Sequence, residues 1–504
     1  ASSAVWSYSY LPHSDLIQQL TNNYGQLTTY AYDPRRDLKT QVLNKFGAIP
    51  ISQFDYSHDA LGRWVQRIDS AAVTNDFGYN NRSESTDAVM GTNALGYQYD
   101  SIGNREWTRR NAGTNRYIAN ELNQYLSVSS ALSAASLSYD SDGNLTNDGV
   151  FTYAWDGENR MIAVEPLNPT SGAKKVVSDY DFMGRRVEKK VYTRQSDLWP
   201  LTADISFMYD GWDLVREGIV DSGKPRTNFY LWGLDLSRTL QGAGGVGGLL
   251  ASINQQPSAI NHFFYDANGN VIDLIDTNGE FVAQYVYDPY GNLDVQSGVL
   301  STDNVFRFSS KYADAEVGLT YYGFRYYQSS LGLWVSRDPL GEAAFANPYT
   351  YVANSPLNSY DLLGLLTLVV DWPGVEKGDY GWQGDYPNDY GEAYSPSDES
   401  QYGYGLTPEQ LENMLFETAS STSKRCTLIK EGPPFCSLDG RQKKMCFYEC
   451  MNWAFKGDVC VASRRTFESE AMLSIFPCTR SYGTGDETST FEPQEPIVVT
   501  SPRG

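Results

Sequence analysis

Two acidic residues, Asp338 and Asp361, have a type and spacing that could support cleavage of a bond. They are 23 residues apart, which is enough chain for a loop to bring both side chains back to one place. Two carboxyls held close together split their pKa values, so that one stays charged and activates water while the other gives a proton to a leaving amine. This is the chemistry of aspartic proteolysis, and it requires a fold in which the two side chains meet.

The segment around these aspartates carries a dense motif of aromatic, glycine and asparagine residues. Its pieces are Phe324-Arg325-Tyr326-Tyr327, Leu331-Gly332-Leu333-Trp334-Val335-Ser336-Arg337-Asp338-Pro339-Leu340-Gly341, Asn347-Pro348-Tyr349-Thr350-Tyr351, Asn354-Ser355-Pro356 and Asp361-Leu362-Leu363-Gly364-Leu365. The segment resembles the RHS repeat-associated core, which closes the β-shell of RHS/YD-repeat polymorphic toxins. The same core occurs in the insecticidal toxin-complex C components.

The resemblance implies a self-cleaving aspartic protease with Asp338 and Asp361 as its carboxylates. It places the family's arginine at Arg325, where a guanidinium can hold one carboxylate ionised or bind the scissile carbonyl. It also places the cut between Leu365 and Leu366, with a variable cargo after the cut. The alternative is that both aspartates only cap turns.

Two positions depart from the family pattern. Leu362 replaces a proline, which relaxes a turn that would aim Asp361, and Leu333 stands where an arginine is common. Neither change removes a proposed catalytic group. The residues between the two aspartates are expected to be scaffold, with Asn347, Asn354 and Pro356 in turns and with Tyr349 and Tyr351 alternating along a strand.

A motif of the form Tyr-Asp-x-x-Gly-[Asn/Arg] recurs through the first 300 residues. Asp can accept hydrogen bonds from backbone N–H groups two residues on, and Gly supplies the positive φ of a tight turn, so each copy predicts a β-hairpin. A lone hairpin is marginally stable, and many must stack side by side. Clear copies begin at Tyr99, Tyr139, Tyr180, Tyr265 and Tyr287, and weaker copies at Asp59, Trp155 and Tyr209.

The resemblance implies that these hairpins form an all-β, spiralling shell around a hollow. The shell is expected over residues 1–300 and the closing core with its protease motif over residues 301–365. An ordinary antiparallel sandwich with similar turns is the alternative.

The composition agrees with strands and turns and excludes some functions. The 504 residues include 37 Tyr and 44 Gly, and only 20% are charged. The mean hydropathy is −0.44, and no apolar run is long enough to span a membrane. A net charge of −22 argues against a nucleic-acid partner.

Two patterns look like ligand sites but predict ordinary turns. Gly242-Ala243-Gly244-Gly245-Val246-Gly247 matches a dinucleotide-binding fingerprint, yet the residues after it show no helical period, so a Gly-rich junction between strands is predicted. Asp140-Ser141-Asp142-Gly143-Asn144 hints at a calcium loop but lacks the later glycine and glutamate of such a loop. No cofactor or metal is therefore expected.

The composition of the chain changes after residue 365. Residues 366–405 open with the strand-like Leu366-Thr367-Leu368-Val369-Val370 and continue as a Gly-, Tyr- and acid-rich linker. A Cys-rich domain is expected over 406–482, with a helix that begins at Thr407 and short strands such as 445–450. Residues 483–504 are rich in Thr, Glu and Pro and predict a disordered tail.

All six cysteines lie in this C-terminal region, and an even number in so short a stretch predicts a disulfide framework. Their connectivity stays open. Zinc is the weaker alternative because no C-x-x-C pair is present, and a Cys–His nucleophile lacks its base because no His follows residue 262. The cysteines are Cys426, Cys436, Cys446, Cys450, Cys460 and Cys478.

The leading hypothesis is the C-terminal part of an RHS-family toxin, with a shell that holds a cargo released by self-cleavage. Its expected partners are its own cargo, an immunity protein and a delivery machine, and its expected location is secreted or cell-surface. A cell-surface adhesion protein with a disulfide-stapled binding module, and a decayed fragment, are the alternatives. The chain opens Ala1-Ser2-Ser3 without an export signal, which fits a mature product, an internal fragment or the cargo of a machine that reads no such signal.

Overall fold

The computed structural model describes residues 5–255, 258–341 and 346–369, together with short strands between residues 426 and 500. The chain divides into two compact units, residues 6–374 and residues 375–504 with 1–5. The first unit contains the repeats and the closing motif. Within the described residues, no helix has the length and apolar character needed to cross a bilayer.

The wall of the first unit is built from consecutive antiparallel strands, each paired with the next one along the chain. Strands β1 to β13 form one sheet and β14 to β27 a second, with Leu137 between them. The strands of the first sheet are β1 (Val5–Tyr10), β2 (Ile17–Asn22), β3 (Gln26–Tyr32), β4 (Lys39–Phe46), β5 (Ile49–His58), β6 (Trp64–Asp69), β7 (Thr74–Tyr79), β8 (Ser85–Met90), β9 (Asn93–Tyr99), β10 (Arg105–Arg110), β11 (Gly113–Ala119), β12 (Tyr125–Ser129) and β13 (Ala134–Ser136). Those of the second are β14 (Ser138–Tyr139), β15 (Leu145–Asn147), β16 (Phe151–Trp155), β17 (Met161–Pro166), β18 (Lys174–Tyr180), β19 (Arg186–Thr193), β20 (Leu201–Asp210), β21 (Asp213–Asp221), β22 (Lys224–Trp232), β23 (Leu249–Gln255), β24 (Ser258–Tyr265), β25 (Val271–Asp276), β26 (Phe281–Tyr287) and β27 (Leu293–Ser297).

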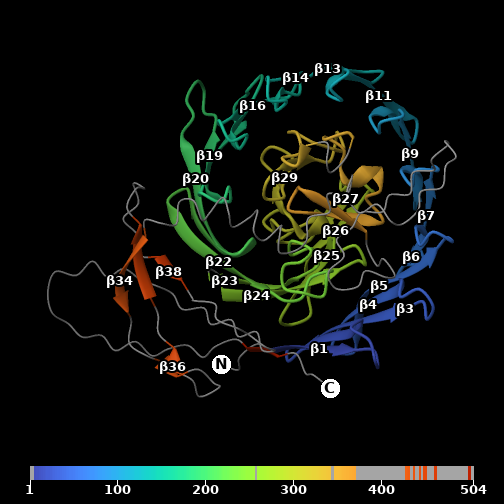
Figure 1. Cartoon of the computed structure of the whole chain (residues 1–504), viewed down its shortest axis with the longest axis vertical. Helices are drawn as coiled ribbons and strands as arrows, with labels where there is room; N and C mark the ends of the chain where they lie inside the picture. Colours follow the sequence, from blue (N-terminus) through green and yellow to red (C-terminus); the bar gives the residue numbers. More distant parts are fainter. Residues whose placement is uncertain are drawn as a thin grey trace, which may run out of the picture. The chain divides into compact units, whose positions relative to one another are not determined.

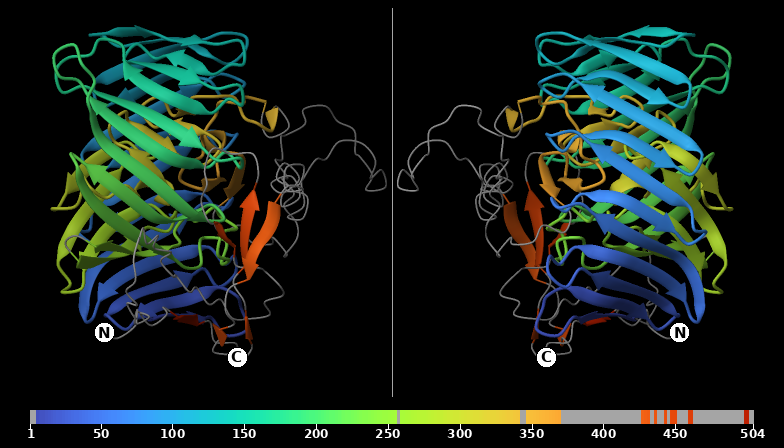
Figure 2. Two further views of the ribbon diagram at one scale, coloured as in Figure 1. Left: turned by 90° about the vertical axis from the view of Figure 1, so that its left-hand side faces the viewer. Right: turned by 90° about the vertical axis from the view of Figure 1, so that its right-hand side faces the viewer.

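These strands wind around in a ring, and the last strands of the series, β25 to β27, lie inside that ring (Figure 1). Seen from the side, the wall strands run obliquely next to one another (Figure 2). The expected spiral is therefore present, and the ordinary sandwich is excluded for this unit. The wall begins at β1, ahead of the first Tyr-Asp motif.

Side chains, rather than a ladder of strand pairs, join the two ends of the spiral. The Gln26 Nε2 donates to the Phe263 carbonyl at 2.9 Å, and the Asn44 Nδ2 donates to the Tyr265 carbonyl at 3.0 Å. The Tyr56 hydroxyl accepts the Ala267 N–H at 3.0 Å. These hydrogen bonds join the first strands of the wall to β24 and to the turn after it, and they satisfy buried polar groups along this seam.

Seven of the eight predicted Tyr-Asp copies make a turn by local hydrogen bonds from the aspartate, whereas at the copy that begins at Tyr209 the residue Asp210 ends β20 and pairs with Asp213 across a two-residue turn. The Asp100 Oδ1 accepts the Ile102 N–H at 3.0 Å and the Asn104 N–H at 2.8 Å, and Gly103 takes a φ of +92°. The Tyr99 hydroxyl donates back to the carbonyl of Ser85 at 2.9 Å. The same aspartate-to-backbone bonds recur at Asp59, Asp140, Asp156, Asp181, Asp266 and Asp288.

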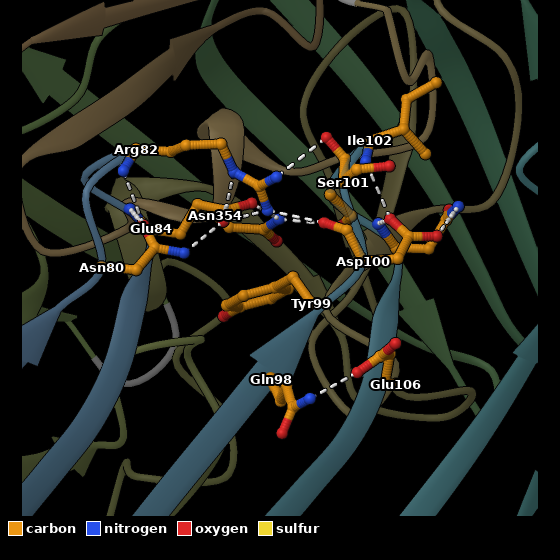
Figure 3. A network of polar contacts seen from close by, with 12 residues as sticks. Asn80, Arg82, Glu84, Gln98, Tyr99, Asp100, Ser101, Ile102, Glu106 and Asn354 are labelled. Carbon is orange, nitrogen blue, oxygen red and sulfur yellow. Dashed lines mark hydrogen bonds and ion pairs between the residues drawn. The ribbon is translucent and has the colours of Figure 1, made fainter.

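Neighbouring turns are also tied to one another. Figure 3 shows Arg82, which donates to the Asp100 carbonyl at 2.6 Å and to the Ser101 carbonyl at 2.8 Å in the next turn along the wall. Farther along the wall, Arg185 donates from its turn to the Gly211 carbonyl at 2.6 Å. Arg185 follows the glycine of its motif, whereas Arg82 stands one residue before Ser83, which occupies the glycine position of its turn. Arginines at both positions therefore link successive turns.

The closing motif forms a small core that lies within the ring (Figure 1). Its four-stranded antiparallel sheet packs around buried aromatic rings of Tyr322, Tyr327, Trp334 and Tyr351. A two-stranded hairpin follows it. The elements are the 3-10 helix η1 (Phe308–Ser310), β28 (Tyr312–Asp314), β29 (Leu319–Tyr321), β30 (Tyr326–Gln328), β31 (Leu333–Trp334), the 3-10 helix η3 (Val352–Asn354), β32 (Ser359–Leu362) and β33 (Leu366–Val369).

The core is bound to the turns of the wall by its own asparagines. The Asn354 Nδ2 donates to Glu84 at 3.1 Å and to the Gly103 carbonyl at 2.9 Å (Figure 3). The Asn347 Nδ2 donates to the Asn104 side chain at 2.8 Å, and this makes the expected scaffold role of both asparagines concrete.

The prediction of a strand through Tyr349 and Tyr351 was wrong. A turn and η3 occupy this stretch, and Val352 and Ala353 take positive φ values of 41° and 51°. Both tyrosine side chains are buried, so their alternation does not mark two faces of a strand. The Tyr349 hydroxyl instead donates to the Gly143 carbonyl at 2.8 Å.

A buried ion cluster joins the core to the opposite part of the wall. The Asp314 carboxylate, at the end of β28, contacts Arg186 at 2.5 Å and Lys189 at 2.9 Å, and both of these come from β19. All three side chains are at most 2% exposed. Burial and the two cations act in opposite directions on this carboxyl, and the net result is a lowered pKa of Asp314.

A cavity of about 1090 Å³ lies between strands β16 to β22 of the wall and residues 302–316 of the core. Charged side chains line much of it, which makes the interior of the ring polar on this side. Among them are Lys189, Glu217, Arg226, Arg307 and Glu316.

Two glycines at equivalent turn positions allow a matched test of how the core seats on the wall. Gly143 and Gly184 both have positive φ values, +87° and +77°. A Cβ at Gly143 would lie 2.5 Å from the Tyr349 hydroxyl and from the Cδ of Arg337, whereas a Cβ at Gly184 would meet nothing within 4 Å.

We therefore expect Gly184→Ala to cost about 1 kcal/mol through the strained φ alone. Gly143→Ala should cost about 1–3 kcal/mol more, because it also pushes against the core. The measurement is the free energy of unfolding in urea for the two variants. Equal costs would contradict the close seating of Tyr349 on this turn.

Both ligand-like patterns are turns. Gly242–Gly248 connects β22 to β23, and no helix follows it, as predicted for a Gly-rich junction. The Asp140 carboxylate accepts the Asp142 and Asn144 N–H groups at 3.0 and 2.8 Å, as the aspartates of the other turns do.

The second unit is described only through the backbone of short strands. A three-stranded sheet has the order β34 (Cys426–Glu431), β37 (Cys446–Cys450) and β38 (Val459–Val461), and β35 (Phe435–Cys436) pairs with β36 (Gln442–Lys443). The strand predicted over 445–450 corresponds to β37. In the stretch predicted as a disordered tail, β39 (Val498–Thr500) is a short strand, in keeping with its β-branched residues.

Other predictions for this unit lie outside the described residues. These are the helix from Thr407, the linker beyond Val369 and all the cysteine side chains, so the disulfide framework stays a prediction.

Candidate active site

Arg325 is the centre of the polar cluster beneath the closing motif. It precedes β30 and is 3% exposed, and its guanidinium lies 4.3 Å from the centre of the Trp334 ring. Its Nε donates to the Gly364 carbonyl, and its NH1 donates to the Pro348 carbonyl at 3.0 Å. A guanidinium with donors in a rigid fork can hold several segments in one geometry, and here it ties together three parts of the core.

The two aspartates predicted to form a pair meet at this arginine. The NH2 of Arg325 is 2.7 Å from the Asp338 Oδ2 and 3.9 Å from the Asp361 Oδ2. Asp338 follows β31 and is 6% exposed, while Asp361 lies in β32 and is 1% exposed. One nitrogen of the Arg325 guanidinium therefore lies near two buried carboxyls that are far apart in sequence.

The expected cleavage bond lies in the hairpin that carries Asp361. Strands β32 and β33 pair antiparallel with Leu362 opposite Leu366, so the bond between Leu365 and Leu366 falls where the turn enters β33. Leu363 and Gly364 take positive φ values of 62° and 80°, which makes the turn tight. A leucine in this backbone region is unfavourable, and the buried surroundings must hold it there.

The Asp361 carboxylate lies directly against this turn. Its Oδ1 accepts the Gly364 N–H at 2.6 Å and the Leu365 N–H at 3.0 Å. The aim of the carboxylate thus comes from the N–H groups of the turn and not from the residue at position 362. Both of these hydrogen bonds are present with Leu362 in place of the family's proline.

Burial dominates the electrostatics of the pair. It raises the pKa of Asp361 to about 7, although Arg325 acts to lower it, and the negative charge of Asp338 adds to the rise. Burial also raises the pKa of Asp338 against the influence of Arg325. Because the guanidinium is nearer to Asp338, Asp361 is the carboxyl more ready to carry a proton, and with a pKa of about 7 it is about half protonated at neutral pH.

The structure brings together every residue that the sequence placed in the site: Arg325, Asp338, Asp361 and the Leu365–Leu366 bond. Turn capping, the alternative, is also present, because Asp338 accepts the Leu340 N–H at 2.9 Å. The two descriptions are compatible, since the capping bonds use Oδ1 of each carboxyl and leave Oδ2 toward Arg325.

Sequence reasoning missed the groups that complete the site. They are the Gly364 and Pro348 carbonyls and the Trp334 ring around Arg325. Trp334 and Pro348 belong to the motif, but nothing in a sequence marks a backbone carbonyl as a partner. Among the described residues, no group of three or more His, Cys, Asp or Glu side chains is arranged to hold a metal ion.

Comparisons with known proteins point to toxins. No family profile matches the chain. The tRNA3(Ser)-specific nuclease WapA of Bacillus spizizenii is 30% identical over 276 residues, which are 53% of this chain and 10% of that protein. The double-stranded DNA deaminase toxin A of Burkholderia cenocepacia is 28% identical over 243 residues, which are 45% of this chain and 16% of that protein.

The fold has a counterpart among solved structures. The crystal structure of TcdB2-TccC3-TEV matches with a TM-score of 0.55 at 16% identity, over 71% of this chain and 19% of that one. The chain belongs to the RHS/YD-repeat polymorphic toxin family. The ring of β1 to β27 is accordingly an RHS shell.

Membership in the RHS family accounts for the fold of the molecule and does not assign an activity to it. The chain spans about a tenth of WapA and about a sixth of the deaminase toxin, so their nuclease and deaminase activities belong to those proteins. At 16% identity the TcdB2-TccC3-TEV structure speaks for the fold alone.

Proposed function

We propose that this chain is part of an RHS-family toxin whose core cuts its own backbone between Leu365 and Leu366. The shell then encloses an effector that begins at Leu366 and is no longer covalently attached to it. The observation that carries the proposal is the position of Arg325, which contacts Asp338, faces Asp361 and binds the carbonyl of Gly364 beside the expected cut.

The chemistry follows from the different environments of the two carboxyls. Asp338, ion-paired at 2.7 Å, is the charged base that takes a proton from water, and the resulting hydroxide adds to the Leu365 carbonyl carbon. Asp361, in the fraction of molecules in which it is protonated, gives its proton to the Leu366 nitrogen as the C–N bond breaks. The products are a Leu365 carboxylate and a Leu366 amine.

The surrounding residues position the reacting groups. The turn N–H groups hold Asp361 against Leu365, and Arg325 holds the preceding carbonyl, so the bond is presented in one orientation. The site is enclosed by the aromatic core, which strengthens these charge interactions because little water screens them.

The shell supplies the container. The cavity of about 1090 Å³ and the overlapping seam fit a wall that keeps a cargo away from its producer until delivery. We further propose an exported or cell-surface toxin that uses a delivery machine and is neutralised by an immunity protein.

Mass spectrometry of the purified chain under denaturing conditions tests the cleavage. We expect two products in place of the 56.3 kDa chain, the second of which begins Leu366-Thr367-Leu368. Denaturation is essential, since β33 stays paired with β32 along four residue pairs after a cut. A single intact chain, or a new N-terminus at another residue, would remove the proposal.

A further inference from the structure

A second buried cation, Lys311, lies beside the cleavage site and has no role in the chemistry above. The residue is 6% exposed and follows Ser309 and Ser310, which both have positive φ values. Its Nζ donates to the Gly244 carbonyl at 2.6 Å and lies 5.4 Å from the centre of the Tyr322 ring. Among the described residues, no carboxylate oxygen is within 4.0 Å of this ammonium.

A buried charge without a directly bonded counter-ion is costly. Packing alone therefore does not account for the presence of the Lys311 charge at this position.

The Gly-rich segment, residues 242–248, connects Lys311 to the scissile hairpin. A Cβ placed on Gly244 would lie 3.1 Å from the Lys311 Nζ and 3.2 Å from the Cδ1 of Leu362. It would also lie 3.4 Å from the Cδ2 of Leu363, at the turn itself. The ammonium and the two leucines therefore share one narrow space, which only a glycine leaves open.

The same segment is held firmly from both sides. Ala243 and Val246 form a buried apolar cluster with Tyr360 of β32, and Leu368 of β33 packs against it. On the other side, the Asp235 carboxylate accepts the Ala243 and Gly245 N–H groups at 2.7 and 3.1 Å.

The charges around Lys311 come from three elements. Asp213 lies in β21, Asp235 in the loop after β22 and Asp361 in β32, and all three act on this lysine electrostatically. Burial is the larger influence and lowers the pKa of Lys311 to about 8, so the amine is charged at neutral pH.

Arg325, Asp338 and Lys311 act electrostatically on Asp361, and the charge of Asp361 acts on the phenol of Tyr351. In a water-excluded site such charges act over longer distances than in water. Lys311 is thus the cation beside Asp361 that makes no contact with Asp338.

We propose that Lys311 is a positioning residue for self-cleavage: its ammonium places a positive charge beside the hairpin that carries Asp361, and its bond to Gly244 seats the Gly-rich segment against that hairpin. This inference rests on the proposed function. It assigns a task to the Gly-rich segment, which sequence analysis could describe only as a junction.

The expected effect of removing the charge has a definite sign. Cleavage needs a protonated Asp361, so the rate for the native chain should fall as the pH rises through the pKa of Asp361, about 7. Lys311 lowers that pKa, and an uncharged residue in its place lets it rise further. The alkaline limb of the rate profile should therefore move upward by about one pH unit.

The test follows cleavage of the full chain after a change of pH. The chain is made by cell-free translation in the cold with a labelled amino acid and moved into buffers from about pH 5 to pH 9, and the intact and cut chains are counted over time. The variants are Lys311→Met, which removes the charge, Lys311→Gln, which keeps an N–H for Gly244, and Lys311→Arg, which keeps the charge. Thermal unfolding of each variant separates loss of fold from loss of charge.

Lys189→Met is the matched control. It also removes a buried lysine, but one that contacts Asp314 and Glu316 in the cluster between the wall and the core. We expect it to lower stability and leave the midpoint of the alkaline limb unchanged, whereas Met and Gln at position 311 shift it and Arg restores it.

The outcomes separate this inference from the one on which it rests. A native chain that is never cut at any pH removes the proposed function and this role together. A native chain that is cut, with the same alkaline midpoint in folded Lys311→Met or Lys311→Gln, removes only the role of Lys311. A shift that appears equally in Lys189→Met would also overturn it, because the effect would then be general.

Discussion

Replacing Asp338 by Asn leaves the chain uncut: this is the largest effect that we expect from a single side chain. Asn has nearly the same shape, and its oxygen can still accept the Leu340 N–H at 2.9 Å, but it cannot take a proton from water. Loss of a general base typically lowers a rate by about 10²–10⁴-fold. Asp361→Asn should have a similar effect, because it removes the proton donor for the Leu366 amine.

The measurement is the fraction of cut chain over time, from denaturing gels and mass spectrometry. Asp148→Asn is the control, since Asp148 is also buried and also contacts the core, by accepting from Gln328 at 2.9 Å. We expect it to be cut as the native chain is. Normal cleavage in a folded Asp338→Asn variant would mean that the reaction uses other groups, and the aspartates would then only cap turns.

The second large effect concerns stability, and it lies at the buried ion cluster between the wall and the core. Asp314→Ala removes the carboxylate that Arg186 and Lys189 contact at 2.5 and 2.9 Å. Because both cations are at most 2% exposed, their charges remain buried, and Lys189 keeps only Glu316. Removal of one partner from a buried ion pair costs about 3–5 kcal/mol.

Urea unfolding followed by tryptophan fluorescence measures this cost. Asp197→Ala is the comparison, since Asp197 pairs with Arg194 at 3.1 Å but is 98% exposed, and we expect no measurable change in its midpoint. Slower self-cleavage should accompany the Asp314→Ala loss, because β28 belongs to the same core as Arg325. An unfolding midpoint equal to that of the native chain would show that the cluster does not hold the core on the wall.

The sequence alone was informative wherever the interactions are local. In Asp100–Asn104, the aspartate, the glycine and the backbone N–H groups that form the turn all lie within five residues, so the motif itself predicts the hairpin. The pair Asp338 and Asp361 was found differently, through the resemblance of its surroundings to a known core, because spacing alone permits many pairs of acids to meet.

The sequence was least informative where contacts span the ring. Asn354 reaches Glu84 across 270 positions, and Lys311 reaches the Gly244 carbonyl across 67. Such contacts depend on the path of the whole wall, which no local pattern encodes. The alternation of Tyr349 and Tyr351 misled for the same reason, since both rings are buried by elements that are distant in sequence.

By itself, then, the sequence determined the turns, the all-β class and the residues able to do acid–base chemistry. Only the tertiary structure decided that Arg325 lies between the two carboxyls, that turn N–H groups aim Asp361 at Leu365, and that Lys311 stands beside them. The physical reason is that a turn is held by bonds between near neighbours. A buried charge cluster is held by the enclosing walls, and these form only when distant strands come together.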